Sequence, residues 1–119
     1  MNPILVTGSS GLIGAALVTA LRAAGRPVIG VDCRAGADIV QRLAQEASGL
    51  DALLAGVSGV IHLAGVSRVV DGQRDPAACW RENVGLSAAI IAAIARAAAT
   101  VADPGEQPRS AGAGGTARG

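Results

Sequence analysis

The clearest indication of the fold class is the stretch Ile4-Leu5-Val6-Thr7-Gly8-Ser9-Ser10-Gly11-Leu12-Ile13-Gly14. Its first four residues are apolar or β-branched, which predicts a short buried strand. Glycines follow at positions 8, 11 and 14, and apolar residues at helical spacing run from position 12 to position 24. Glycine at these three places allows, in order, a tight turn, a close approach of the backbone to a pyrophosphate, and close packing of helix on strand. The stretch therefore predicts a phosphate-binding turn that opens a helix.

A second strand and an acidic residue complete the unit. Gly25 suits the C-terminal cap of the helix, and Val28-Ile29-Gly30-Val31 is a second apolar strand. Asp32 ends that strand, 24 residues after Gly8. A carboxylate there can accept both hydroxyls of an adenosine ribose and repels a 2′-phosphate, whereas Arg34 could meet such a phosphate. We therefore expect NAD as the cofactor, with NADP as the less favoured alternative.

The rest of the chain extends this strand–helix–strand unit. We expect a short strand over 38–40, a helix over 41–56 with a break at Ser48-Gly49, a strand over 57–63, a loop over 66–75, and a helix from Pro76 to about 100, capped by Asp75. This order predicts an α/β fold of three layers, a Rossmann-type parallel sheet with flanking helices, incomplete on its C-terminal side. Residues 1–100 would form the dinucleotide-binding domain, and 101–119 a tail that is disordered or frameshifted.

Composition excludes several classes of protein. The 119 residues are 50% hydrophobic and 16% charged with a net charge of +1, so we expect neither overall disorder nor binding to nucleic acid. The most apolar window, 86–95, has about half the ~20 residues that a membrane span needs, and no basic leader is visible. One histidine and two cysteines, Cys33 and Cys79, predict no metal site. We expect a cytoplasmic protein without a membrane partner.

Four motifs in order resemble one family. They are Gly-x-x-Gly-x-x-Gly from Gly8, the stretch Val60-Ile61-His62-Leu63-Ala64-Gly65, the pair Asp75-Pro76, and Asn83-Val84-x-x-Ser87. Together they resemble the extended short-chain dehydrogenase/reductase superfamily, and within it the NAD-dependent epimerase/dehydratase family that includes UDP-glucose 4-epimerase. The resemblance covers residues 3 to about 97. The last motif departs from the family pattern, because Leu86-Ser87 stands where Gly-Thr is usual.

The resemblance implies which residues bind the cofactor. They are Gly8, Ser10, Gly11, Leu12, Ile13, Gly14, Asp32, Leu63, Ala64 and Gly65. Two pairs, Asp38-Ile39 and Arg42-Leu43, fit the family's adenine contact, and both stay open. For His62 we favour a structural role, with its ring satisfied by backbone, over catalysis.

The family's catalytic residues are missing from this chain. The resemblance implies a Ser or Thr followed by Tyr-x-x-x-Lys, but the chain has no Tyr and no Lys. Codon degeneracy over residues 97–112 permits a one-base frameshift that encodes an apolar strand ending in Ser-Ser, which is typical of the family's next strand. We therefore expect the NAD-binding portion of a protein acting on a sugar nucleotide or similar substrate, inactive as this truncated chain. The alternatives are a non-catalytic dinucleotide-binding or interaction module, which could form a homodimer through helix 76–100, and a non-functional remnant.

Overall fold

Four parallel strands form the middle layer of the molecule. The computed structural model describes residues 2–65 and 69–101. The strands are β1 (Ile4–Thr7), β2 (Val28–Asp32), β3 (Ile39–Val40) and β4 (Gly59–His62), in the spatial order β3-β2-β1-β4. All three neighbouring pairs are parallel, which confirms the predicted sheet.

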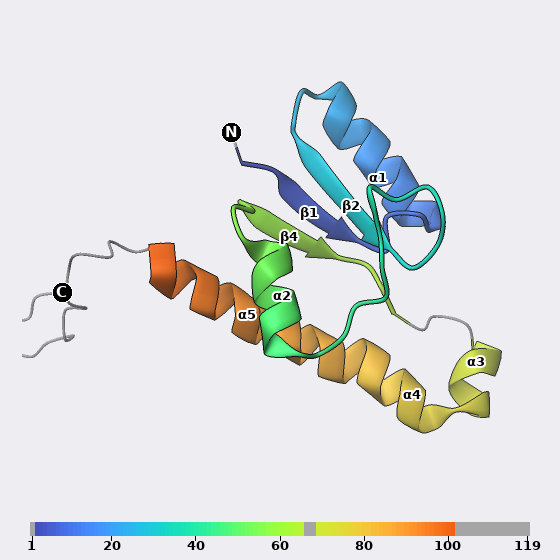
Figure 1. Cartoon of the computed structure of the whole chain (residues 1–119). Coiled ribbons are helices and arrows are strands. Elements are labelled where there is room, and N and C mark those ends of the chain that lie inside the picture. Colours follow the sequence, from blue (N-terminus) through green and yellow to red (C-terminus); the bar gives the residue numbers. More distant parts are fainter. Residues whose placement is uncertain (1, 66–68, 102–119) are drawn as a thin grey trace, which may run out of the picture.

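Helices cover both faces of this sheet. Helix α1 (Leu12–Ala23) lies on one face, and α2 (Ala47–Leu54) and α5 (Leu86–Val101) lie on the other (Figure 1). The core under α2 and α5 joins the buried sheet residues Leu5 and Val31 to Leu50 of α2 and Leu86 of α5. Buried residues follow helical spacing along α2 and α5, whereas β1 and β2 bury consecutive residues. Burial on both faces is typical of strands in a parallel sheet that helices cover on both sides. The predicted three-layer α/β architecture is thus confirmed.

One long helix leads into α5 (Figure 1). It begins with α4 (Pro76–Trp80), continues through a π-helical turn, η1 (Arg81–Gly85), and ends in α5. The Asp75 carboxylate caps its start by accepting a hydrogen bond from the Ala78 N–H at 3.0 Å, as the sequence predicts. The same sequence predicts a uniform α-helix and gives no sign of the π turn.

The π turn has an identifiable support from outside the helix. The Gln45 side chain donates a hydrogen bond through Nε2 to the Arg81 carbonyl at 3.1 Å, and the Leu86 N–H also reaches that carbonyl. A Cβ on Gly85 would lie 2.5 Å from Gln45 Nε2. Glycine at this position therefore leaves room for the Gln45 side chain to reach the helix backbone.

The long helix is also apolar. By length and composition alone, Pro76–Ala99 is able to cross a membrane, with a mean hydropathy of 1.3. The sequence predicts that the apolar window 86–95 is too short to span a membrane. The helix that contains this window is longer, because α4 and η1 precede α5 without a break. Among the described residues of this helix, Leu86, Ile90 and Ala93 are buried, although only 17% of its apolar 18-residue window is buried.

Two sequence-based boundaries are wrong. The helix expected over 41–56 starts only at Ala47, and Ser48-Gly49 lies inside α2 rather than breaking it. Burial of Leu50 and Leu54 in the core stabilises α2, although Ser48 and Gly49 favour helix only weakly. Part of the expected loop over 66–75 is a short helix, α3 (Val69–Arg74). Residues 66–68 of that loop and the tail 102–119 lie outside the described residues.

Candidate functional site

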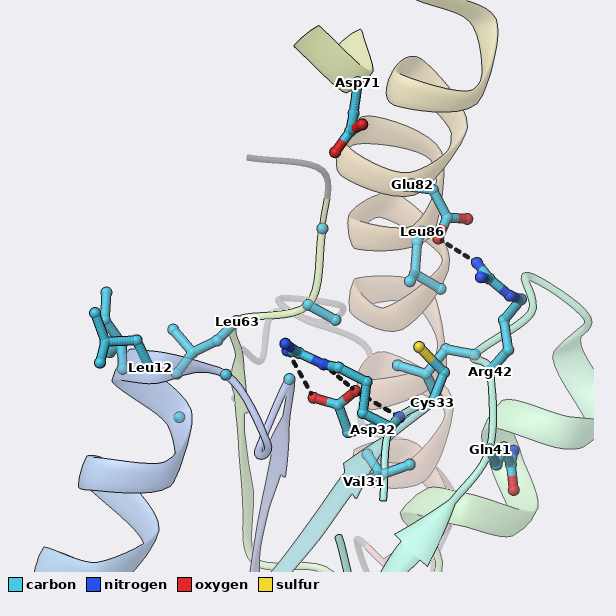
Figure 2. Close-up of a pocket in the computed structure, with 18 residues that line it drawn as sticks. Leu12, Val31, Asp32, Cys33, Gln41, Arg42, Leu63, Asp71, Glu82 and Leu86 are labelled. Carbon is cyan, nitrogen blue, oxygen red and sulfur yellow. Dashed lines mark hydrogen bonds and ion pairs between the residues drawn. The ribbon is translucent and has the colours of Figure 1, made fainter. Parts of the chain in front are cut away.

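Three loops meet at the carboxyl edge of the sheet. The parallel register places Thr7 of β1 beside Val31 of β2 and His62 of β4, so the chain leaves all three strands at one level. The loops that follow border a cavity of about 670 Å³ (Figure 2). Crevices at this edge of open parallel sheets are where such folds bind ligands.

The glycine turn after β1 forms the floor of this cavity. Gly8 has a φ of +70°, and a Cβ there would lie 2.8 Å from the Ala64 N–H nitrogen. A Cβ on Gly14 would overlap the Gly8 carbonyl oxygen. Gly8 is therefore required by its left-handed backbone and by contact with the end of β4, and Gly14 by contact of α1 with the turn.

Gly11 differs from its two neighbours in the motif. It has an ordinary φ of −77°, at the residue before α1. A Cβ at this position would meet only Arg34 Nη2 at 3.1 Å and the Gly8 carbonyl oxygen at 3.3 Å. Because Gly11 lines the cavity, its missing side chain leaves the start of α1 open to a ligand. Free N–H groups at a helix start attract anions such as phosphate.

Asp32, which lies at the cavity (Figure 2), is a buried carboxylate that accepts four hydrogen bonds. Its Oδ2 accepts from the Ser10 N–H at 2.9 Å, and its Oδ1 accepts from the Arg34 N–H at 3.0 Å. The Arg34 guanidinium donates two more hydrogen bonds, from Nε to Oδ1 at 3.2 Å and from Nη2 to Oδ2 at 3.3 Å. Burial has the largest single effect on the pKa of Asp32 and raises it. The hydrogen bonds from Arg34 and Ser10 and the arginine charge together outweigh burial and lower this pKa from 3.8 to about 2.

Thr7 ties the end of β4 to β1. Its hydroxyl oxygen accepts hydrogen bonds from the Leu63 N–H at 3.0 Å and the Ala64 N–H at 3.1 Å. The same hydroxyl lies 2.6 Å from Nδ1 of His62, so its own proton goes to that nitrogen. Burial lowers the pKa of His62, which favours the neutral ring.

The environment of His62 corrects one detail of the sequence analysis. Of the two ring nitrogens, Nδ1 is hydrogen-bonded to the side chain of Thr7 and not to backbone. Nε2 is buried without a hydrogen-bond partner in the part of the chain that the structure describes. His62 does not line the cavity, which agrees with a structural role.

The predicted site residues gather around this one cavity. It is lined by Gly8, Gly11, Leu12, Ile13, Gly14, Asp32, Leu63, Ala64 and Gly65. Ser10 is the exception among the predicted residues, since it contributes its backbone N–H to Asp32 and its hydroxyl to the Ala35 carbonyl.

Only one of the two candidate pairs for adenine contact lies at the cavity. Arg42 and Leu43 line the cavity. Asp38 turns away, because its Oδ2 accepts hydrogen bonds from the Gly30 N–H at 2.7 Å and from Arg22 Nη2 at 2.6 Å. Of the two pairs, the structure therefore brings Arg42-Leu43 to the site.

Sequence reasoning missed several lining residues on distant elements. Asp71 of α3, Glu82 of η1 and Leu86 of α5 reach the cavity from the opposite side to the glycine turn (Figure 2). Glu82 accepts a hydrogen bond from Arg42 at 3.2 Å, which links η1 to the segment before α2. Leu86 lies within the Asn83–Ser87 motif, but that motif does not assign it to the cavity. The positions of Glu82 and Leu86 depend on where the long helix crosses the sheet, and that of Asp71 on the placement of α3. Within residues 2–65 and 69–101, no group of three or more His, Cys, Asp or Glu could hold a metal.

Comparisons with known proteins agree with this geometry. A model of the NAD-dependent epimerase/dehydratase family matches residues 4–102. Among solved structures, MoeE5 in complex with UDP-glucose and NAD is 33% identical, with a TM-score of 0.68 over 80% of this chain and 33% of that one. An NAD-bound short-chain dehydrogenase/reductase superfamily protein from Agrobacterium tumefaciens is 35% identical, with a TM-score of 0.65 over 79% of this chain and 29% of that one.

A more distant structure shares the fold. The UDP-glucose-4-epimerase from Stenotrophomonas maltophila, with bound NAD and formylated UDP-arabinopyranose, is 24% identical, with a TM-score of 0.72 over 82% of this chain and 34% of that one. The chain therefore spans about a third of the length of the solved structures it matches. A search of curated protein sequences found no match.

Proposed function

This chain belongs to the NAD-dependent epimerase/dehydratase family, and we propose that residues 1–100 are the NAD-binding portion of a protein that acts on a sugar nucleotide or a similar substrate. The observation that carries the proposal is the meeting of the glycine turn and Asp32 in one cavity. The cavity volume of about 670 Å³ lies in the range of small-molecule and cofactor sites.

The residues present fit the parts of NAD. The open start of α1 at Gly11 would hold the pyrophosphate through backbone N–H groups. Asp32 would accept the hydroxyls of the adenosine ribose, and the backbone of Leu63, Ala64 and Gly65 would line the cofactor. Bound NAD supplies hydride transfer, and this chain's own residues bind and orient it.

The chain offers no acid or base of the kind that the family resemblance implies. It contains neither Tyr nor Lys, and the half-buried His62 does not line the cavity. We therefore propose that this chain alone binds the cofactor without turnover.

Exposed apolar side chains favour one alternative, a non-catalytic binding or interaction module. Trp80 is 66% exposed and Ile91 is 67% exposed on the long helix, with Ile94 and Val84 also exposed. Burying such a face is a general reason for helices to pair. A homodimer through helix 76–100 follows from this alternative.

The cofactor proposal is tested by titrating the purified chain with NADH and following its fluorescence. We expect saturable binding for the wild type and its loss in Gly11→Val, because the added side chain enters the approach to the start of α1. Gly59→Val is the matched control, since a Cβ at Gly59 meets nothing within 4 Å and Gly59 does not line the cavity. Equal binding by the wild type and Gly11→Val would overturn the assignment of the glycine turn.

A further inference from the structure

The carboxylate of Asp32 has no acceptor position to spare in this structure. An ionised carboxylate offers about four lone-pair positions. Two backbone N–H groups and two guanidinium nitrogens of Arg34 already donate to it. A ribose diol can therefore reach Asp32 only if one or more of these donors leaves.

The four donors are not equally able to leave. The two backbone bonds, from Ser10 and Arg34, measure 2.9 and 3.0 Å and belong to the turns that shape the cavity. The two guanidinium bonds are longer, at 3.2 and 3.3 Å. Their side chain is 62% exposed, whereas that of Asp32 is 4% exposed. The guanidinium is the donor that a ligand can displace, because its two bonds are the longer ones and its side chain can move into solvent without disturbing the turns.

We propose that Arg34 is a specificity-determining residue that occupies the adenosine-ribose position in the free protein and is displaced when a dinucleotide binds. The inference rests on the proposed function and goes beyond it. The guanidinium donates two hydrogen bonds to the carboxylate, and the two hydroxyls of a ribose can donate two in their place. Displacement of Arg34 therefore leaves the buried carboxylate satisfied, which removes the main cost of breaking the ion pair.

The same movement has a different consequence for NADP. A 2′-phosphate cannot donate to Asp32 and is repelled by it. The displaced guanidinium, still attached beside the site, can pair with such a phosphate. Arg34 thus weakens NAD binding, because it competes with the ribose for Asp32, and strengthens NADP binding, because it pairs with the 2′-phosphate. Both effects reduce the preference for NAD over NADP that Asp32 produces.

The test measures the dissociation constants of NAD and NADP for the wild type, Arg34→Ala and the control Arg26→Ala. Arg26 is exposed and does not line the cavity, so its variant loses the same charge away from the site. We expect Arg34→Ala to bind NAD about 2- to 5-fold more tightly and NADP about 10-fold more weakly. Arg26→Ala should change both constants by the same small factor. The decisive quantity is the ratio of the dissociation constants of NAD and NADP. A general loss of attraction to the pyrophosphate, which both cofactors contain, does not change this ratio.

A second measurement follows Arg34 directly. We expect addition of ADP-ribose to the wild type to shift the side-chain Nε–H resonance of Arg34, as its ion pair with Asp32 breaks. An unchanged ratio of constants in Arg34→Ala, or an unshifted Nε–H resonance at saturation, would overturn the inference and leave NAD binding intact. Failure of the wild type and of every variant to bind either cofactor would overturn the proposed function itself.

Discussion

Gly11 and Gly14 belong to one motif but meet different surroundings. The position of a Cβ on Gly14 is already filled by backbone atoms of the turn, with the Gly8 carbonyl carbon and Ser9 Cα each 2.9 Å away. At Gly11 the Arg34 guanidinium is the nearest group and can move. Substitution of Gly14 should therefore affect mainly the stability of the fold, and substitution of Gly11 mainly ligand binding.

We predict that Gly14→Ala lowers the free energy of unfolding by about 1–3 kcal/mol, the usual cost of overpacking. Gly11→Ala should change it far less, because only a flexible side chain has to move. Urea unfolding followed by far-UV circular dichroism measures both variants. Equal losses in the two variants would contradict the distinction drawn here.

Asp32 makes the stability of the chain depend on pH. Its pKa is lowered to about 2 in the folded state, so its ionised form contributes stability above the unfolded pKa of about 3.9. This contribution is lost as the pH falls through the folded pKa. We predict that wild type is more stable than Asp32→Asn at pH 6 and that the difference shrinks toward pH 2. Denaturant unfolding at several pH values measures it, and a constant difference would show that Asp32 is not linked to folding in this way.

At the scale of elements, the start of the long helix depends on one side chain. The Asp75 carboxylate accepts the Ala78 N–H, and Pro76 occupies the first helical position. We predict that Asp75→Ala destabilises the fold by about 1 kcal/mol, while Asp75→Asn, which keeps an acceptor oxygen, loses much less. Thermal unfolding of the two variants compares them, and identical losses would mean that the charge and not the cap matters.

Patterns read from the sequence predict elements whose cause is local. The apolar run before Gly8, the acceptor Asp75 and the φ > 0 glycine at position 25 all act within a few residues, and the structure agrees with each of them. The failures have distant causes. The π turn receives a hydrogen bond from Gln45, more than 30 residues away along the chain. Helix α2 includes Ser48-Gly49, and its Leu50 and Leu54 pack in the core.

The candidate site divides in the same way. The glycine turn and Asp32 are adjacent to strand ends and can be predicted from spacing. Glu82 and Leu86 enter the cavity from η1 and α5, and their contribution follows only from how the long helix crosses the sheet. Arg34 was visible in the sequence as a possible phosphate partner, but its ion pair with Asp32 required the structure.

At the scale of the whole molecule, the fold provides a cofactor cavity without the family's acid/base pair. We predict no epimerase, dehydratase or reductase turnover by this chain with NAD and a panel of UDP- and dTDP-sugars. General acid–base catalysis contributes roughly 10²–10⁴-fold, and the Tyr and Lys that the family resemblance implies are absent from all 119 positions. A double variant, Gly11→Val with Asp32→Ala, controls for contaminating host enzymes. Turnover that disappears in that variant would show the chain to be an active enzyme.

In the proposed function, NAD binds where the glycine turn, Asp32 and the end of β4 meet. Amide chemical-shift mapping with ¹⁵N-labelled chain and ADP-ribose tests this location most directly. We predict that the largest shifts fall on residues 8–14, 32–34 and 63–65, which surround the cavity. Residues 55–59, at the opposite end of the sheet near the start of β4, should shift least. Saturable binding with its largest shifts at residues 55–59, or spread evenly over the chain, would contradict the account.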